Sequence, residues 1–427
     1  MNPKALREIT LEQWKEVYPS LEGGTPRSCL AGLLQRKAGP HAVVVAGLRR
    51  AGKSTLLYQI SKTYAPSEFY LFTFEDERLL RFQAGDFNVL YEVLLELFGP
   101  RKVFFFDEIQ NVPHWESFVR RMQERGNKFF LSGSNASLLS RELGARLTGR
   151  SFIQELYPFS FREYLDFKKI AAPNFAKSTA ASRAFIKKHF NAYLRRGGIP
   201  EYLKYGDSSL LKRLYEDILY RDIVTRHEIK AVSALRELAL YFMSHPGSLF
   251  SYNRLKGALG LGSDNTVKSF TGFLEDSYLI FTLSQFSYSL KRQFMAPRKV
   301  YAVDTGLMEA VAFQFSKNEG KFLENLVFLE LKRRGGEIFF YKSDNGLEVD
   351  FLLKRGRGVT GLIQVTSDFS NASTREREIK SLVRGLKDLN LNEGLILTME
   401  EEDEIRQEGK KIRVRPVYSW LLEGGKG

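Results

Sequence analysis

Apolar residues in the first part of the chain gather in short runs that are separated by helical patterns. The runs span residues 43–47, 69–74, 103–108, 129–134 and 152–159, and each has the length of a strand. Nearly continuous apolar strands that alternate with helices indicate a parallel sheet covered by helices on both faces. We therefore predict an α/β domain with a parallel sheet over residues 1–165.

The pattern changes beyond this domain. Residues 166–230 are predicted to be mostly helical, and residues 231–304 to form three helices followed by two strands. Residues 305–427 are predicted to contain a helix at 318–334, strands at 337–341, 348–353 and 361–366, a helix at 374–389, and strands near 394–398 and 412–418. The pattern thus predicts four segments with boundaries near 165, 230 and 305.

A glycine-rich motif follows the first predicted strand and opens a helical run. Residues 47–54 have the form G-x-x-x-x-G-K-[ST], in which backbone N–H groups and the following helix N-terminus surround phosphate oxygens. Lys53 is expected to reach the β- and γ-phosphates, and the Ser54 hydroxyl to bind Mg²⁺. The sequence therefore predicts ATP and magnesium as cofactors, with a contact set of Gly47, Arg49, Arg50, Ala51, Gly52, Lys53, Ser54 and Thr55.

Two carboxylates end the third apolar run. Asp107 and Glu108 would lie at the carboxyl edge of a parallel strand, where ligands bind in such sheets. Asp107 is predicted to hold the magnesium ion, and Glu108 to act as the general base toward water. Because an adjacent glutamate suits water activation, the pair favours a hydrolytic ATPase over a kinase.

Further polar candidates follow the next strand. Asn135 or Ser134 could orient the water, and both could equally serve as helix caps. Arg146 and Arg150 precede the fifth apolar run and are candidates for an arginine that reaches a neighbouring subunit's γ-phosphate. A surface role is equally open for Arg146. We therefore expect a homo-oligomer, with a ring as one arrangement.

The positive charge is concentrated in the middle of the chain. Of the 64 Lys and Arg residues and 50 Asp and Glu residues, 22 basic and 11 acidic ones fall within residues 166–300. A locally basic region favours a polyanion such as DNA as a partner, although a basic soluble surface is the alternative.

Residues 235–304 have the order of a winged helix, namely three helices and then two strands with a basic connection. The third helix, 265–277, would present Asn265, Thr266 and Lys268 to a major groove. The connection would bring Lys291, Arg292, Arg298 and Lys299 to phosphates. Packing against other parts of the protein is the alternative use of such a domain.

Eight motifs occur in an order that resembles the prokaryotic, notably archaeal, AAA+-type ATPases with a C-terminal domain of unknown function. They are GLRRAGKSTLL, FFFDEIQNVPHW, LSGSNASLL, LTGRSF, ELYPFSFREYL, GGIPEYL, KVYAVDTGL and ENLVFLELKRRG, and they span essentially the whole chain. The resemblance implies an ATPase core at 1–165, a helical lid at 166–230, a winged helix at 231–304, and a nuclease-like domain at 305–427.

The last segment departs from the nuclease pattern at its expected site. Its helix and strand order matches the restriction-endonuclease core, which places Glu324 on the first helix and Asp350 on a strand. The usual second carboxylate and lysine fall on Gln364 and Thr366, and threonine supplies no positive charge. Lys342 or Lys354 could substitute. We expect a nuclease-like fold with weak or no cleavage.

The composition of the chain indicates the cellular compartment. The single cysteine, Cys29, fits a reducing compartment, and the charged N-terminus and the lack of a long apolar run predict a cytoplasmic protein without a membrane span. The leading hypothesis is a DNA-associated ATPase that binds, remodels or translocates on duplex or branched DNA. The alternatives are an ATP-driven signalling or assembly switch whose C-terminal domain binds protein, and an ATP-dependent nuclease.

Overall fold

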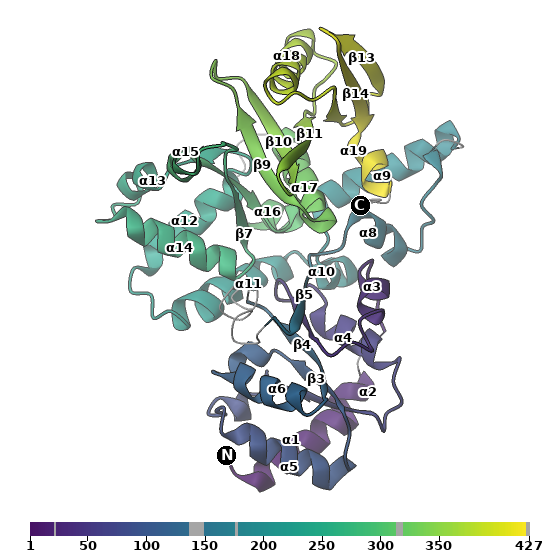
Figure 1. Cartoon of the computed structure of the whole chain (residues 1–427), viewed down its shortest axis with the longest axis vertical. Helices are drawn as coiled ribbons and strands as arrows, with labels where there is room; N and C mark the ends of the chain where they lie inside the picture. Colours follow the sequence, from purple (N-terminus) through teal and green to yellow (C-terminus); the bar gives the residue numbers. More distant parts are fainter. Residues whose placement is uncertain (21–22, 136–148, 176–177, 313–318, 424–427) are drawn as a thin grey trace. The chain divides into compact units, whose positions relative to one another are not determined.

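The computed structural model describes residues 1–20, 23–135, 149–175, 178–312 and 319–423 (Figure 1). The chain divides into two compact units. The first contains Met1–Tyr157 together with Asp276–Tyr278, and the second contains Pro158–Glu275 and Leu279–Gly427. Each unit has its own sheets and core, and each is described by itself below.

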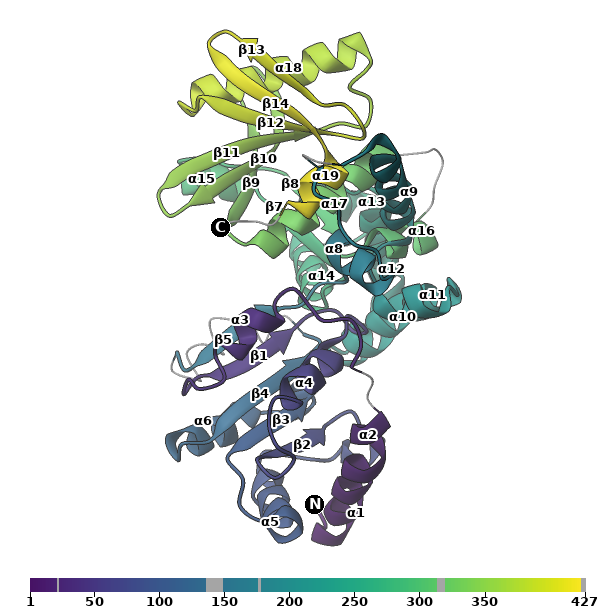
Figure 2. The ribbon, with the colours of Figure 1, turned by 90° about the vertical axis from the view of Figure 1, so that its right-hand side faces the viewer.

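The first unit is built on a five-stranded parallel sheet with the order β2-β3-β4-β1-β5 (Figure 2). The strands follow the predicted apolar runs: β1 (Ala42–Ala46), β2 (Phe69–Thr73), β3 (Val103–Asp107), β4 (Lys128–Gly133) and β5 (Ser151–Glu155). The helices are α1 (Pro3–Glu12), α2 (Tyr18–Ser20), α3 (Leu30–Leu34), α4 (Lys53–Ser61), α5 (Asp86–Phe98) and α6 (Trp115–Glu124). The prediction of an α/β fold with a parallel sheet is confirmed.

Aromatic residues hold neighbouring strands of this sheet in register. Phe104 stacks on Phe129 and Phe105 on Phe130, each pair with ring centroids 4.8 Å apart. The two pairs lie on opposite faces, because successive side chains of a strand alternate. All four rings are fully buried, so helices cover both faces of β3 and β4.

The second unit begins with helices. They are α8 (Phe161–Phe167), α9 (Ala180–Arg196), α10 (Pro200–Tyr205) and α11 (Ser209–Asp217), and a π-helical stretch then spans Ile218–Thr225. The elements that follow are α12 (Val232–Ser244), β6 (Leu249–Phe250), α13 (Tyr252–Ala258), α14 (Asp264–Asp276), β7 (Ile280–Leu283), α15 (Leu290–Met295), β8 (Arg298–Ala302) and α16 (Thr305–Val311). Strands β6, β8 and β7 form an antiparallel three-stranded sheet.

The rest of this unit is a six-stranded mixed sheet with the order β13-β14-β12-β11-β10-β9. Its elements are α17 (Glu319–Arg334), β9 (Glu337–Lys342), β10 (Glu348–Arg355), β11 (Gly358–Val365), α18 (Ala372–Asp388), β12 (Glu393–Thr398), β13 (Asp403–Gln407), β14 (Lys410–Pro416) and α19 (Val417–Leu422). Apolar residues of α18 pack on β10, β11 and β12 and form the core. The chain therefore has a second α/β domain at its C-terminal end.

Three of the motifs noted in the sequence meet at Asp304, the N-cap of α16. One carboxylate oxygen accepts a hydrogen bond from the Leu307 N–H at 2.9 Å, and the other accepts one from the Gly198 N–H at 2.6 Å. The Gly198 carbonyl oxygen in turn accepts a hydrogen bond from the Phe159 N–H at 2.7 Å, and a side chain at 198 would lie 2.2 Å from the Phe159 carbonyl oxygen. The motifs therefore form a structural joint.

Two expectations need correction. The connection between β7 and β8, expected as a wing, contains the helix α15, and β13 lies in a segment for which no strand was predicted. Among the described residues, no helix is both long enough and apolar enough to cross a membrane.

Candidate functional site

The glycine-rich loop connects β1 to α4 in the first unit, as predicted. Gly47 follows β1, and a side chain there would lie 2.1 Å from the carbonyl oxygen of Leu156, so only glycine fits beside the neighbouring strand. Gly52 caps α4 with a φ of 93°, a left-handed conformation that glycine adopts without strain. The loop thus ends at a helix N-terminus whose first N–H groups are available to an anion.

Lys53, the first residue of α4, is buried and lies over this loop. Its ammonium donates to the Leu48 carbonyl oxygen at 3.1 Å and lies 3.3 Å from the Glu108 carboxylate. Asp107 at the end of β3 accepts hydrogen bonds from the hydroxyls of Ser54 and Ser132. The structure therefore brings together Lys53, Ser54, Asp107 and Glu108, which the sequence had placed 54 residues apart.

The surroundings shift the pKa values of the adjacent carboxylates Asp107 and Glu108 in opposite directions. Burial and the neighbouring Glu108 charge raise the pKa of Asp107 to about 6, against the hydrogen bonds from Ser132 and Ser54 and the charge of Lys53. Burial also acts to raise the pKa of Glu108, but the Lys53 charge and hydrogen bonds from Gln110 and Ser134 outweigh it and hold the pKa below its ordinary value. Glu108 is therefore ionised at neutral pH and can accept a proton.

Two side chains that hold Glu108 are Ser134, which the sequence offered as an alternative to Asn135, and Gln110, which was not predicted. Ser134 donates to the Glu108 carboxylate at 3.0 Å, and the Gln110 amide donates to both side chains. Glu108 itself has a φ of 51°, a left-handed conformation that non-glycine residues rarely adopt and that occurs at functional sites. Ser134 was an alternative in the sequence, whereas nothing in the sequence distinguished Gln110.

The other predicted residues of the first unit have different positions. Asn135 is buried directly after β4. Arg150 precedes β5, is half exposed, and lies 3.4 Å from Glu124. Arg146 lies outside the described residues. Arg49 of the loop forms an ion pair with Glu75 at 2.8 Å, Arg50 is exposed with a φ of 63°, and Ala51 is buried.

A cavity and a buried arginine adjoin the loop. The cavity has a volume of about 350 Å³, and Ser54, Asp107, Thr73 and Glu75 are among the residues that line it. Arg27 donates to the carbonyl oxygens of Ala51 at 2.8 Å and Tyr157 at 2.6 Å. Ser54 and Asp107 thus border open space, and Arg27 links the loop to Tyr157.

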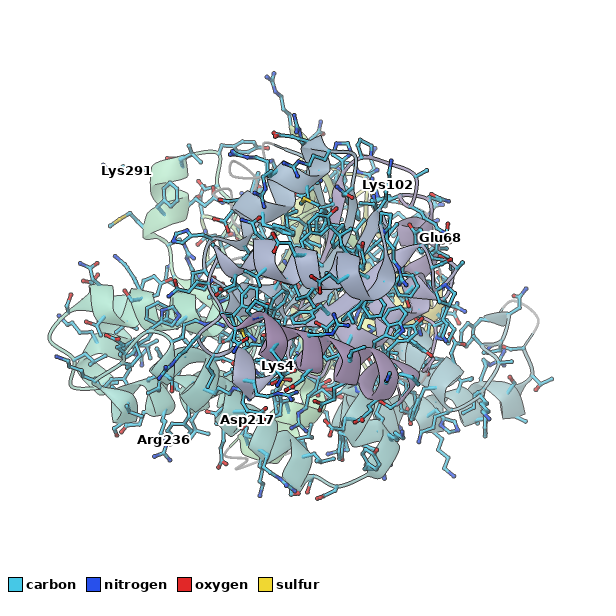
Figure 3. The ribbon with its side chains drawn as sticks, turned by 90° about the horizontal axis from the view of Figure 1, so that it is seen from below. Lys4, Glu68, Lys102, Asp217, Arg236 and Lys291 are labelled. Carbon is cyan, nitrogen blue, oxygen red and sulfur yellow. The ribbon has the colours of Figure 1, made fainter. Side chains whose placement is uncertain are left out.

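The predicted DNA-contacting residues of the second unit are exposed or partly exposed, with one exception. Asn265 and Lys268 on α14 are exposed, and Thr266 is partly so; Lys268 pairs with Asp264 at 3.3 Å. Lys291 and Arg292 on α15 are exposed, and Arg298 is partly exposed. Figure 3 shows Lys291 on α15 and Arg236 on α12 on the outside of the ribbon.

Lys299 corrects the prediction that it contacts phosphate. Its side chain is 2% exposed and faces Glu324, Glu348 and Asp350. Val300, Tyr301 and Ala302 are buried as well, so both faces of β8 are covered from Lys299 onward. Lys299 is therefore removed from the candidate phosphate contacts.

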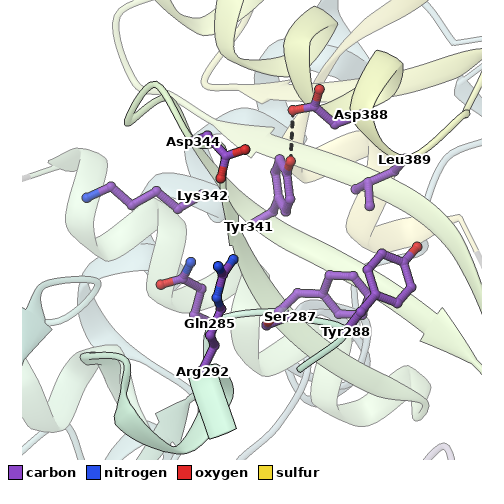
Figure 4. Close-up of a pocket in the computed structure, with 10 residues that line it drawn as sticks. Gln285, Ser287, Tyr288, Arg292, Tyr341, Lys342, Asp344, Asp388 and Leu389 are labelled. Carbon is purple, nitrogen blue, oxygen red and sulfur yellow. Dashed lines mark hydrogen bonds between the residues drawn. The ribbon is translucent and has the colours of Figure 1, made fainter. Parts of the chain in front are cut away.

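A pocket of about 210 Å³ lies beside α15 (Figure 4). Arg292 and Gln285 point toward Tyr341 and Asp344. In this view Gln285 and Tyr288 lie on opposite sides of Arg292. The Tyr341 hydroxyl donates to Asp388 at 2.8 Å. The pocket thus offers aromatic rings beside both positive and negative groups.

The residues predicted for the C-terminal site do lie together. Asp350 on β10 accepts a hydrogen bond from the Val365 N–H at 3.0 Å, and the Gln364 amide oxygen accepts one from the Asp350 N–H at 3.2 Å. Glu324 and Asp350 share the ammonium of Lys299. Among the described residues, no group of His, Cys, Asp and Glu side chains has an arrangement that could hold a metal ion.

The parallel sheet, the loop between β1 and α4, and the carboxylates at the end of β3 define a P-loop ATPase domain. Residues 39–165 match the family described as AAA domain, residues 187–318 match a domain of unknown function (DUF8612), and residues 319–419 match another (DUF4143). The fold and site therefore place the first unit among the AAA-type P-loop ATPases.

Two relatives match most of the chain. The chain is 35% identical over 396 residues to the uncharacterized protein MJ1544 of Methanocaldococcus jannaschii, and the match covers 89% of this chain and 88% of the relative. It belongs to the same family as that protein. An uncharacterized protein of Haemophilus influenzae is 28% identical over 342 residues, which are 76% of this chain and 82% of the relative.

Solved structures share less with this chain. A Walker-type ATPase of Pyrococcus abyssi is 16% identical, with a TM-score of 0.41, and the match covers 67% of this chain and 95% of that one. The Holliday junction branch migration motor RuvB of Thermotoga maritima is 18% identical with a TM-score of 0.30, over 65% and 92% of the two chains. The assignment of the first unit to the P-loop fold therefore rests on its strand order and on the loop between β1 and α4, not on these structures.

Proposed function

We propose that this protein is a DNA-associated ATPase that hydrolyses ATP with magnesium and couples hydrolysis to binding, remodelling or translocation of duplex or branched DNA. One observation carries the ATPase part: Lys53, Ser54, Asp107 and Glu108 converge at the loop between β1 and α4. The ammonium of Lys53 and the oxygens of Ser54 and Asp107 are the kinds of group that bind the phosphates and the ion of a magnesium nucleotide.

The residues present fit such a ligand. The Ser54 hydroxyl and the Asp107 carboxylate are adjacent oxygen donors, the kind of ligand that Mg²⁺ prefers. The ion, when bound, neutralises phosphate charge. Lys53 exchanges its bond to Glu108 for one to phosphate oxygens, and Glu108, held by Ser134 and Gln110, then accepts a proton from water.

The order of elements in residues 232–302 supports a winged helix. Helix α12 is followed by β6, α13, α14, β7, α15 and β8, and the three strands form one antiparallel sheet. In such domains the third helix, here α14, enters a major groove. Asn265, Thr266 and Lys268 lie on the outer surface of α14 and are the proposed base and phosphate contacts.

Helix α15 adds a surface suited to nucleic acid. Tyr288, Leu290 and Phe294 are 83%, 68% and 73% exposed, beside the exposed cations Lys291 and Arg292. Basic groups next to exposed rings are typical of surfaces that contact phosphates and unstacked bases together. We infer that this helix and the pocket of Figure 4 contact DNA, with Arg298 as a further phosphate contact.

The position of Arg150 supports a homo-oligomer. The Arg150 carbonyl oxygen accepts a hydrogen bond from Ala42 N–H, at the amino end of β1, whereas the loop follows the carboxyl end of that strand. Five residues of strand span about 17 Å. Arg150 is thus too far to reach the nucleotide of its own chain, and we propose that it contacts the site of a neighbouring subunit, as in a ring.

The C-terminal domain is proposed to have a nuclease-like fold without strong cleavage. The order of α17, β9, β10, β11, α18 and β12 is that of the restriction-endonuclease core, and Glu324, Asp350 and Gln364 gather at its expected site. Plasmid or four-way-junction DNA should remain intact with magnesium. Cleavage that disappears in Asp350→Ala would show an active nuclease.

ATP hydrolysis should be measured with no DNA, single-stranded DNA, duplex DNA and a four-way junction, with Lys53→Ala as the blank. We expect stimulation by at least one DNA form, and a stimulation that falls steeply with salt, because phosphate contacts release counterions. Hydrolysis that is the same with every DNA would favour the signalling or assembly switch.

Two sets of variants separate the parts of this proposal. Asn265→Ala with Lys268→Ala should weaken duplex binding and reduce its salt dependence, and unchanged binding would exclude the groove contact. Arg150→Ala should abolish hydrolysis and spare ATP binding. Normal turnover in Arg150→Ala would exclude the arginine as a contact between subunits.

A further inference from the structure

Strand β8 presents two polar side chains to the C-terminal domain. Lys299 and Tyr301 lie two residues apart and so share one face of the strand. The Asn325 side chain on α17 holds this strand in place, because it accepts from the Ala302 N–H at 2.8 Å and donates to the Ala302 carbonyl oxygen at 3.0 Å. Together with the pairing of β8 with β6 and β7, these contacts fix the strand that carries Lys299.

The Lys299 ammonium lies at the centre of three carboxylates. It is 3.1 Å from Glu324 on α17, 2.8 Å from Glu348 and 3.0 Å from Asp350, both on β10. An ammonium group has three N–H donors, so each carboxylate can accept one of them. The Tyr301 hydroxyl donates to the same Glu324 oxygen at 2.7 Å.

Two of these carboxylates also contact other groups. The second oxygen of Asp350 accepts from the Val365 N–H at 3.0 Å. Gly247, which has a φ of 71°, lies against Glu324, and a side chain at 247 would be 2.6 Å from a Glu324 oxygen. Gly247 and Lys299, which both precede the C-terminal domain in the sequence, thus contact carboxylates of that domain.

We propose that the ammonium group of Lys299 is the resident cation of this carboxylate cluster, so that the C-terminal domain binds no divalent cation there. A buried ammonium in contact with Glu324, Glu348 and Asp350 leaves no position at which an ion could contact the same three oxygens. The magnesium that a nuclease fold would require therefore does not fit. Instead, the cluster joins β8 to the C-terminal sheet through one positive charge.

This inference concerns residues that take no part in ATP binding, and it stands whether or not the protein binds DNA. It assigns to Lys299 a position that the sequence left to Lys342 or Lys354. Lys354 instead pairs with Glu337. A cleaving enzyme would need its lysine next to a bound metal ion, whereas this lysine occupies the place of the ion.

The test is Mn²⁺ binding by the full-length, nucleotide-free protein, followed by the electron paramagnetic resonance signal of free Mn²⁺. The original protein and Asp350→Asn should bind Mn²⁺ equally. Lys299→Met, which keeps the side-chain length without the charge, should gain one Mn²⁺ site, and the double variant with Asp350→Asn should lose it. Lys354→Met is the matched control and should gain none.

Binding by the original protein that disappears in Asp350→Asn would overturn the proposal, and this comparison is decisive even if Lys299→Met fails to fold. A folded Lys299→Met, with an unchanged circular dichroism spectrum and no new Mn²⁺ site, would also overturn it. Lys299→Arg keeps a cation in place and should bind no more Mn²⁺ than the original protein. A gain in Lys299→Met and none in Lys299→Arg would support the proposal.

Discussion

Replacing Asp304 tests the joint at which three motifs of the second unit meet. The carboxylate is 2% exposed and accepts from the backbone N–H groups of Gly198 at 2.6 Å and Leu307 at 2.9 Å, and the Gly306 N–H makes a smaller contribution. A buried donor left without an acceptor costs about 1–3 kcal/mol, so Asp304→Ala should lower the free energy of unfolding by about 2–6 kcal/mol. Asp304→Asn should be nearly as damaging, because its NH₂ group would face one of the two donors.

The loss should also depend on pH in a defined direction. Burial raises the pKa of Asp304 to about 6, against the backbone hydrogen bonds and the Arg333 charge, whereas the ordinary value is 3.8. Because the folded pKa is the higher one, this group adds stability below about pH 4 and loses it as the pH rises through about 6. The difference between the original protein and Asp304→Ala should therefore widen by about 2 kcal/mol between pH 7.5 and pH 4.

The assay is urea unfolding followed by the fluorescence of Trp420, which lies in the second unit, in a protein with Trp14→Phe and Trp115→Phe. Asp207→Ala is the matched control, because this exposed aspartate also accepts a backbone N–H, that of Ser209 at 2.9 Å. It should change the free energy of unfolding by less than about 1 kcal/mol. An Asp304→Asn protein as stable as the original would refute the reasoning.

Three further predictions concern the first unit. Glu108→Gln should lower ATP turnover by about 10²–10⁴-fold and retain ATP binding, measured with a fluorescent nucleotide, because only the proton acceptor is lost; unchanged turnover would exclude Glu108 as the base. Magnesium-dependent ATP binding should weaken as the pH falls through about 6, where Asp107 becomes protonated and loses its charge; constant affinity from pH 5 to 7.5 would contradict this. Gly47→Ala should lower the free energy of unfolding by about 1–3 kcal/mol, because its Cβ would lie 2.1 Å from the Leu156 carbonyl oxygen, and Gly85→Ala, which has nothing within 4 Å, should change it little; both are measured by urea unfolding followed by the fluorescence of Trp14 and Trp115, in a protein with Trp420→Phe.

Local patterns were sufficient for the nucleotide-binding fold. The five apolar runs became β1 to β5, and the loop and the carboxylates of β3 met because parallel strands end at the same edge of a sheet. Strand β13 was missed because its residues, Asp403–Gln407, are polar and mostly exposed, so they show no buried face.

Long-range contacts were beyond the reach of such patterns. Lys299 stands in a run of charged residues that suggests a surface, yet its carboxylate partners are contributed by α17 and β10, 25 to 51 residues further along the chain. Gln110 likewise contacts Ser134 only because β3 and β4 are neighbours. The sequence shows which groups are charged, and the fold decides which of them become buried together.

The two hydrogen bonds of Arg27 have a mechanical consequence for the first unit. One guanidinium holds the Ala51 carbonyl oxygen of the phosphate-binding loop and the carbonyl oxygen of Tyr157, the residue at which the chain leaves this unit. A rotation of the Ala51 peptide when phosphate enters the loop would pull on Tyr157 through a rigid planar group only a few atoms across. Arg27 thus ties a peptide of the phosphate-binding loop directly to the last residue of the segment Met1–Tyr157.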